Sequence, residues 1–115
     1  MYWLKINGGF VLMDKSEVLT KAKQYADLVS KNVHPRKIIL YGSYAKGNWS
    51  EDSDIDIAVI VGSVKGDFLE LETKLYKLKR NIDDRIEPVL LEEDNDRSGF
   101  LDTIKEHGYI IYNAS

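Results

Sequence analysis

The chain has 115 residues, 43% apolar and 30% charged, which is typical of one globular domain. A net charge of −3 and a pI near 5.4 exclude a basic surface for bulk nucleic-acid binding, but not the binding of a single nucleotide. The absence of cysteine excludes disulfides and thiolate metal sites, and no apolar run reaches the ~18 residues of a membrane span. The N-terminal stretch lacks a signal-peptide pattern, so we expect a cytoplasmic protein without a membrane segment.

The N-terminal segment, residues 1–13, is mildly apolar, and we expect it to be an extension of the main domain, residues 14–115. Residues 2–6 and 10–12 flank an Asn-Gly-Gly turn, which predicts a short hairpin. Its aromatic side chains would offer an apolar patch to a partner or to a second copy of the chain, which would make a homo-oligomer.

Helices and strands alternate along the rest of the chain. Asp14 and Glu17 have the spacing of a capping box, so the first helix is expected to begin at Asp14 and to end before Pro35. Gly108 is expected in the C′ position of the last helix. The order predicts an α/β (α+β) fold with a mixed sheet. Apolar patterns predict, in order, a strand at 37–41, a strand at 55–61, a helix at 68–82, a strand at 85–91, a helix at 98–107 and a strand at 109–112.

The turn after the first predicted strand has the residues of a phosphate-binding loop. Gly42 permits backbone conformations that are closed to other residues and lets a ligand approach closely. Ser43 supplies a hydroxyl and a backbone N–H at the start of a short helical turn that Gly47 ends. Lys46, three residues further on, can reach the same phosphate as a point charge.

Two carboxylates stand at the start of the second predicted strand. Asp54 and Asp56 are two residues apart, so they project to the same side and repel each other unless a cation lies between them. Mg²⁺ commonly takes one or two carboxylates together with substrate phosphates. A third carboxylate would allow a two-metal site. The candidates are Glu87, inside the third strand, and Asp84, whose place before that strand fits a solvated turn equally well.

Each feature has an ordinary structural explanation alone, since Gly-Ser pairs are common and Asp-x-Asp often begins a turn. Together, Gly42-Ser43, ten intervening residues and Asp54-Ile55-Asp56 resemble the signature of the DNA polymerase β-like nucleotidyltransferase superfamily. Residues 42–47 and 53–57 resemble, more narrowly, its minimal nucleotidyltransferases. The order of the predicted elements extends the resemblance over most of residues 14–112. It implies the minimal polymerase-β-like fold, with helices mainly on one face of the mixed sheet.

The resemblance implies a Mg²⁺-dependent transfer of a nucleoside monophosphate, AMP from ATP, to a hydroxyl, with release of pyrophosphate. Gly42 and Ser43 would hold the triphosphate, and Asp54 and Asp56 would bind two Mg²⁺ ions. The family usually has an aspartate as its third carboxylate, which acts on the acceptor hydroxyl. Glu87 stands in that place here, and we take it as the third catalytic and metal-binding residue.

The resemblance also implies a partner protein. Minimal members lack the helical substrate domain of larger relatives and are often encoded beside a helical HEPN-type protein. They act as antitoxins, in some cases by adding AMP to a tyrosine of the toxin. The alternative is a catalytically weak or inactive nucleotide-binding module that neutralises a helical partner by forming a complex, because glutamate at position 87 departs from the family pattern.

Overall fold

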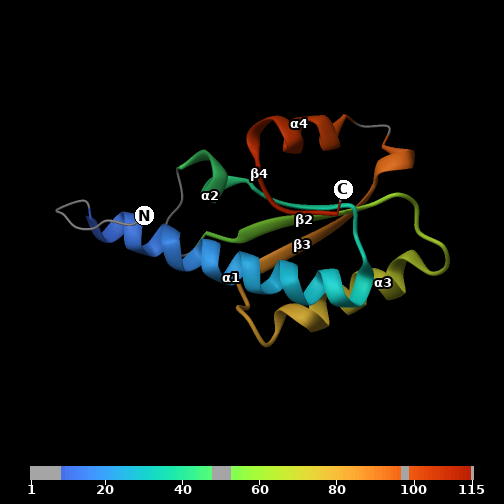
Figure 1. The fold of residues 1–115 in the computed structure, drawn as a ribbon, viewed down its shortest axis with the longest axis horizontal. Helices are drawn as coiled ribbons and strands as arrows, with labels where there is room; N and C mark the ends of the chain where they lie inside the picture. Colours follow the sequence, from blue (N-terminus) through green and yellow to red (C-terminus); the bar gives the residue numbers. More distant parts are fainter. Residues whose placement is uncertain (1–8, 48–52, 97–98, 115) are drawn as a thin grey trace.

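A computed structural model describes residues 9–47, 53–96 and 99–114 (Figure 1). Helices and strands alternate after a long first helix, as the sequence predicts. The elements are α1 (Gly9–Val33), β1 (Lys37–Tyr41), α2 (Ser43–Lys46), β2 (Ile55–Val61), α3 (Phe68–Lys79), β3 (Ile86–Glu92), the 3₁₀ turn η1 (Glu93–Asn95), α4 (Phe100–His107) and β4 (Tyr109–Asn113). None of these helices is long and apolar enough to cross a membrane.

The four strands form one mixed sheet in the order β3-β2-β1-β4. β1 pairs antiparallel with both β2 and β4, whereas β2 and β3 run parallel. The parallel pair is joined through α3, because parallel neighbours need a crossover connection. The predicted mixed sheet is therefore confirmed, and the two central strands are β2 and β1.

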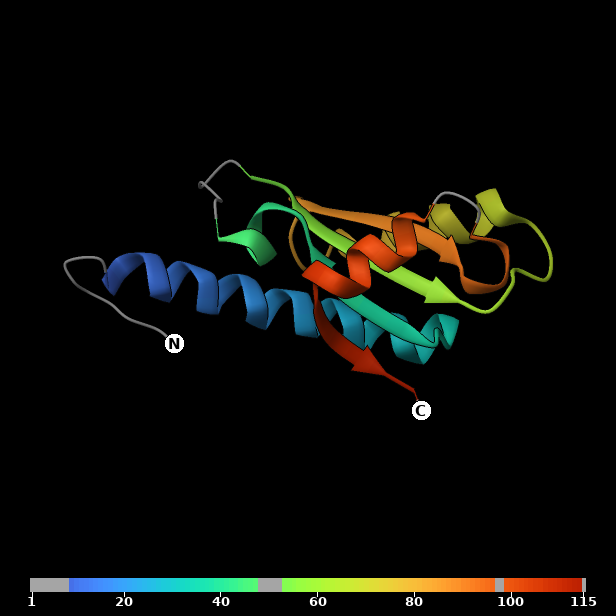
Figure 2. The ribbon, with the colours of Figure 1, turned by 90° about the horizontal axis from the view of Figure 1, so that it is seen from above.

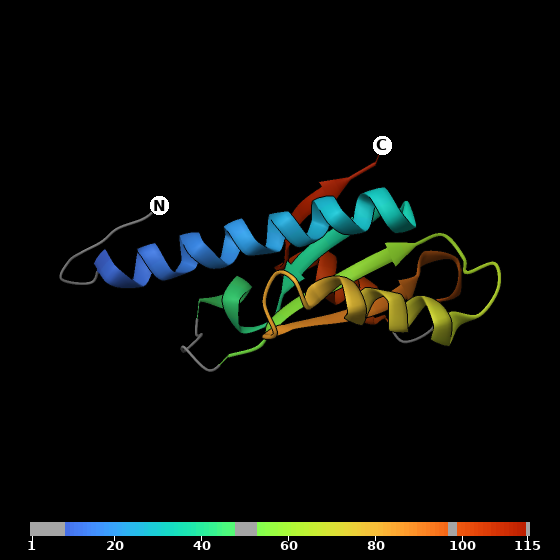
Figure 3. The same ribbon diagram turned by 90° about the horizontal axis from the view of Figure 1, so that it is seen from below.

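One face of the sheet is covered by α1 and α3, as Figure 3 shows. The Tyr25 hydroxyl of α1 donates a 2.8 Å hydrogen bond to the backbone carbonyl of Leu75 in α3, so the two helices are joined inside the core. Burial at this interface raises the pKa of Tyr25. The buried residues that α1 contributes are Val18, Ala22, Tyr25, Ala26 and Val29.

Among the helices of the described residues, α4 alone packs on the opposite face, and it lies across that face in Figure 2. Leu101 and Ile104 of α4 pack on Ile39, Ala58 and Ile60 of the two central strands. Two helices on one face and one short helix on the other confirm the expectation that helices pack mainly on one face. α4 covers only part of its face, so the end of the sheet where β2 and β3 begin can hold polar side chains.

The prediction for the N-terminal segment is partly wrong. Residues 10–12 were expected to be the second strand of a hairpin, but they lie inside α1, which begins at Gly9 rather than at Asp14. The first strand of that hairpin, residues 2–6, lies outside the described residues. A capping box marks where a helix can begin, but each added residue of a formed helix gains a hydrogen bond. Leu12, Met13 and Lys15 are good helix formers, so the helix extends toward the glycines that precede them.

Gly108 ends α4 as predicted, but for a different reason. Its φ of −98° is open to any residue, so the position is not a left-handed cap. A Cβ at this position would collide with Ile39 Cγ2 and lie 2.9 Å from the Leu40 carbonyl oxygen. Glycine is needed because the α4–β4 turn passes directly over β1. The predicted cap of this helix, Ser98, lies outside the described residues.

Candidate active site

The strand register aligns three polar side chains across one end of the sheet. Asp56 is paired with Tyr41 of β1 on one side and with Glu87 of β3 on the other. Neighbouring strands lie about 4.8 Å apart. Ile55 and Ile86, the residues next to these positions, fill the α1–α3 face. Side chains alternate along a strand, so Tyr41, Asp56 and Glu87 point to the face that carries α4.

The carboxylates of this row are close enough to disturb one another. The pKa of Asp56 is raised by burial first, and then by the negative charges of Asp54 and Glu87. Burial, Asp56 and Glu87 together raise the pKa of Tyr41 to about 12. Among the described residues no lysine, arginine or histidine forms an ion pair with any of these three carboxylates. This concentration of negative charge is typical of a site that receives a cation.

The Gly42–Ser43 turn lies directly against Asp56. Gly42 has φ 76° and ψ −150°, a conformation that is essentially restricted to glycine. A Cβ on Gly42 would collide with Asp56 Oδ2 and lie 3.0 Å from Cγ, so this carboxylate occupies the space that a side chain would need. The predicted turn and the predicted carboxylate therefore meet in the fold, although they come from two different strands.

The short helix α2 then carries Ser43 and Lys46 away from β1. Lys46 N–H donates to the Gly42 carbonyl, and Gly47 closes the turn with a left-handed φ of 85°. Ser43 is half-buried and directly follows Gly42, whereas Lys46 is exposed. The structure thus places Gly42 and Ser43 at the row, and leaves Lys46 one turn further out.

Glu87, rather than Asp84, is the third carboxylate of the row. Asp84 is exposed and precedes β3, so it has no place in the register beside Asp56. Glu87 is half-buried, and one of its oxygens accepts a 3.3 Å hydrogen bond from the hydroxyl of Tyr76. Sequence reasoning missed Tyr76, because its helical spacing predicts only a solvated residue. α3 has to pack beside the edge strand β3 before this contact exists.

The donor chemistry at the row fits a divalent cation. Carboxylate oxygens are the ligands that Mg²⁺ prefers, and one or two of them suffice when substrate phosphates supply the rest. Asp54 and Asp56 form such a pair, and burial together with the charges of Asp54 and Glu87 raises the pKa of Asp56, which a nearby cation would offset. No three acidic or histidine side chains converge as a metal-binding group within the described part of the chain. The argument that this site can hold a divalent cation therefore rests on Asp54 and Asp56.

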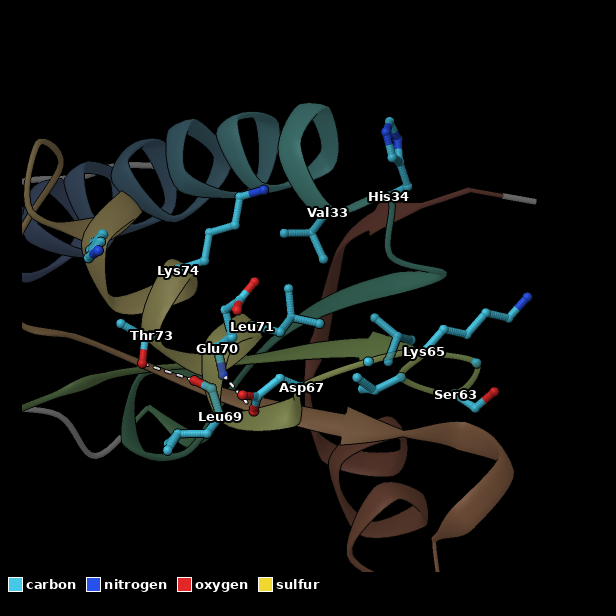
Figure 4. A pocket seen from close by; sticks show the side chains of 15 residues that line it. Val33, His34, Ser63, Lys65, Asp67, Leu69, Glu70, Leu71, Thr73 and Lys74 are labelled. Carbon is cyan, nitrogen blue, oxygen red and sulfur yellow. Dashed lines mark hydrogen bonds between the residues drawn. The ribbon is translucent and has the colours of Figure 1, made fainter.

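A separate open pocket of about 900 Å³ lies at the other end of β2 (Figure 4). Val33, Lys65, Glu70 and Lys74 are among the side chains that line it. Seven strand residues lie between the two ends of β2, a distance of about 20 Å, so this pocket does not include the carboxylate row. Its walls mix cationic, anionic and apolar groups, and nothing in them points to one ligand.

A partly buried cluster of charged side chains anchors the beginning of β3 beside the row. The side chain of Asp83 is 9% exposed and accepts from Arg85 at 2.9 Å and from Lys21 of α1 at 3.1 Å. Arg85 also donates to the hydroxyl of Tyr44 in α2 at 3.3 Å. Hydrogen bonds from Arg85 and Lys21 hold the pKa of Asp83 well below its ordinary value. The cluster therefore connects α1, α2 and β3 at the end of the sheet where the row lies.

Asp83→Asn is expected to lower the free energy of unfolding by about 1–3 kcal/mol at neutral pH, because two cations lose their buried partner. The lowered pKa means that this stabilisation is present above the ordinary aspartate pKa and is lost as the pH falls through the folded value. The difference between variant and wild type should therefore shrink in acid. Denaturant titrations at several pH values measure it, with exposed Asp84→Asn as the matched control. Equal losses in the two variants would contradict the assignment.

Comparison with known proteins shows the family of this chain. Residues 23–115 match the family described as "Polymerase beta, Nucleotidyltransferase". The match covers most of the chain, and the protein belongs to this family, which makes it a nucleotidyltransferase. The resemblance in the signature residues is therefore confirmed at the level of the family.

Two curated relatives come from Methanocaldococcus jannaschii. The chain is 58% identical to "Putative protein adenylyltransferase MJ0604" over 41 residues, which are 35% of this chain and 40% of that protein. This first match thus spans less than half of the relative's length. "Putative protein adenylyltransferase MJ0141" is 27% identical over 101 residues, covering 84% of this chain and 97% of the relative.

Solved structures with the same fold include a nucleotidyltransferase-like chain from Sulfolobus solfataricus. Its TM-score is 0.65 at 21% identity, covering 87% of this chain and 84% of the other. A structure described as "Crystal structure of the toxin-antitoxin with AMP-PNP" has a TM-score of 0.57 at 23% identity, covering 81% of this chain and 74% of that one. At these identities the likeness shows the fold, which confirms the predicted architecture.

Proposed function

We propose that this protein transfers AMP from ATP to a hydroxyl of a partner protein in the cytoplasm, as the antitoxin of a helical, HEPN-type toxin. The observation that carries the proposal is the register that places Asp56 beside Glu87, with the Gly42 turn against the Asp56 carboxylate. A phosphate-binding turn facing clustered carboxylates is the arrangement that transfer from a nucleoside triphosphate needs.

In this proposal the phosphate turn and the carboxylates have separate roles. Gly42 and Ser43 hold the triphosphate, and Lys46 adds a positive charge at its outer end. Asp54 and Asp56 would hold Mg²⁺, with Glu87 as a further ligand if two ions bind. The bound metal would supply charge neutralisation on the phosphates.

Glu87 would accept the proton of the acceptor hydroxyl. The acceptor oxygen forms a bond to the α-phosphorus, the bond from that phosphorus to the β-phosphate oxygen breaks, and pyrophosphate leaves. The Gly42–Ser43 turn would therefore hold the triphosphate, and Glu87 would supply a base beside it.

The relatives supply the nature of the acceptor in this proposal. Two of them are named protein adenylyltransferases, and one structure of the same fold is described as a toxin-antitoxin with AMP-PNP. Incubation of the chain with Mg²⁺ and labelled ATP, with and without the protein encoded beside it, tests the proposal. We expect label on that neighbour, located by peptide mass analysis. Label that stays in ATP in both reactions would contradict it.

Glu87→Gln is expected to lower the rate of transfer about 10²- to 10⁴-fold, the contribution typical of a general base. The amide keeps the shape of the side chain and still accepts a hydrogen bond from Tyr76, so ATP binding should persist. Glu87→Asp is the matched variant, because it keeps the charge and restores the residue usual in the family, and it should retain transfer. The test is to measure the transfer rate and the ATP affinity of the wild type and of both variants. If Glu87→Gln transfers AMP like the wild type, Glu87 is not the base.

The second candidate function is a binding module that neutralises its partner by occlusion. The observation that favours it is that the described carboxylates do not converge as a three-ligand metal group. It predicts a tight complex with the neighbouring protein that survives loss of Asp54 and Asp56 and leaves no AMP on either chain. Neutralisation of the partner by an Asp54→Asn, Asp56→Asn double variant would favour this function over transfer.

A further inference from the structure

Tyr76 brings a phenol hydroxyl to the carboxylate row from within the same chain. The residue lies on α3, which covers the opposite face of the sheet, and reaches the row beside the edge strand β3. Its hydroxyl donates to Glu87 Oε2 at 3.3 Å. Glu87 is the register neighbour of Asp56. A hydroxyl of the chain itself therefore stands where an acceptor hydroxyl has to stand for Glu87 to take its proton.

The ring of Tyr76 is held in this place by Lys79. The Lys79 ammonium lies 5.1 Å from the centre of the ring and donates hydrogen bonds to the carbonyl oxygens of Asp84 and Ile86, at 3.2 and 2.7 Å. Asp84 precedes β3 and Ile86 is its first residue, so the lysine holds the ring beside the strand that carries Glu87. A hydroxyl held in place in this way loses little entropy on reaction.

Tyr76 differs from the tyrosine of the core in what surrounds its hydroxyl. Tyr25 is fully buried and donates to a backbone carbonyl, which is a structural role. Tyr76 is 40% exposed, and its hydroxyl donates to the side chain that is proposed as the base. Because Tyr76 is partly exposed, a substrate can approach the residue from solvent.

We infer that Tyr76 is a site of intramolecular adenylylation. The inference rests on the proposed function and names a second acceptor for the same site. Tyr76 Oη forms a bond to the α-phosphorus of a bound nucleoside triphosphate, and Glu87 takes the phenolic proton. The bond between that phosphorus and the bridging oxygen breaks, and pyrophosphate leaves with this oxygen. The product is a phosphodiester between Tyr76 and the nucleoside.

The test is the mass of the purified chain after incubation with Mg²⁺ and ATP. We expect a mass increase of one AMP per chain, and peptide mapping should place it on Tyr76. Tyr76→Phe should abolish the increase, while Tyr109→Phe, which changes an exposed tyrosine on the opposite edge strand β4, should not. An AMP on any other residue of the wild type, or an unchanged increase in Tyr76→Phe, would overturn the inference.

Two further measurements separate this inference from neighbouring explanations. Binding of a non-transferable ATP analogue should be equal in wild type and Tyr76→Phe, because the variant removes an acceptor and not a nucleotide contact. Weaker binding in the variant would assign Tyr76 a positioning role instead and overturn the inference. The half-time of modification should not change on dilution of the protein, since the acceptor is in the same chain. A half-time that lengthens on dilution would show transfer between chains.

The proposed function is tested separately from self-modification, by measuring AMP on the neighbouring protein. A wild type that labels this partner and carries no AMP on Tyr76 overturns self-modification and leaves the proposed function standing. A wild type that labels neither the partner nor itself overturns both. Label on Tyr76 without label on the partner supports the inference and rejects the proposed acceptor.

Discussion

Asp56→Asn is expected to lower AMP transfer about 10²- to 10³-fold and, at the same time, to stabilise the fold. Asp56 lies at the centre of the row, against the Gly42 turn that is proposed to hold the triphosphate and beside Glu87, the proposed base. Loss of a preorganised charged group at such a position typically costs 10²- to 10³-fold or about 3–4 kcal/mol of barrier. Labelled transfer to the partner measures the first effect.

The gain in stability follows from the raised pKa of Asp56. Burial and two neighbouring carboxylates disfavour its charged form, so at neutral pH the charged Asp56 destabilises the folded state. Asparagine removes the repulsion, and the free energy of unfolding should rise by up to about 1 kcal/mol, the size of a cross-strand charge pair.

The stability difference between Asp56→Asn and wild type should depend on pH. A carboxyl whose folded pKa is raised binds a proton in the folded state before the unfolded state does, so wild type gains stability as the pH falls through the folded value toward 3.8. The advantage of Asp56→Asn should therefore be largest at neutral pH and disappear in acid. Thermal denaturation at several pH values measures it, with exposed Asp27→Asn as the control. A variant that is less stable than wild type at neutral pH would contradict the assigned charge cluster.

Gly42→Ala is expected to have the largest effect on stability. Alanine is strained at φ 76° and ψ −150°, at a cost of about 1–3 kcal/mol, and its Cβ would also collide with the Asp56 carboxylate. Together these terms predict a loss of about 3 kcal/mol or more in the free energy of unfolding. The turn and the carboxylate must separate to relieve the collision, so ATP binding should be lost as well. Denaturant titration and ATP binding measure the two effects.

Gly47→Ala is the matched control, because Gly47 has a similar φ of 85° but nothing within 4 Å of its added Cβ. It should cost only the left-handed strain, about 1–2 kcal/mol. Placing Gly42→Ala in an Asp56→Ala background removes the atoms that the new Cβ meets, so the cost of Gly42→Ala should fall there by ~0.5–3 kcal/mol, the usual coupling of contacting residues. Equal costs at both glycines, or no coupling to position 56, would show that the collision does not matter.

The regular elements of the domain could be predicted where a pattern is strong and local. The strands at 37–41 and 55–61 are confirmed with the same bounds, because their apolar runs are bounded by turn residues. The helix predicted over 68–82 ends earlier, at Lys79, and the third strand is shifted by one residue. The hairpin in residues 1–13 was wrong where it can be judged, since short apolar runs fit a helix and a strand equally well.

The candidate site also contains parts that the sequence predicts and parts that need the structure. Gly42 and Ser43 are separated from Asp54 and Asp56 by only ten residues, and a spacing this short is visible along the chain. The residue pattern alone offered both Glu87 and Asp84, and the family resemblance selected Glu87. The register of β3 against β2 decides for Glu87 as the neighbour of Asp56. The role of each residue in binding or transfer stays a prediction.

The sequence by itself determined the phosphate turn, the pair of aspartates and the order of helices and strands, because these depend on residue type and local spacing. Only the tertiary structure decided how the pieces meet. The strand register places Glu87 beside Asp56, the approach of two strands puts the Asp56 carboxylate against Gly42, and the packing of α3 brings Tyr76 to Glu87. Contacts between residues distant along the chain follow from the packing of whole elements, which no local pattern encodes.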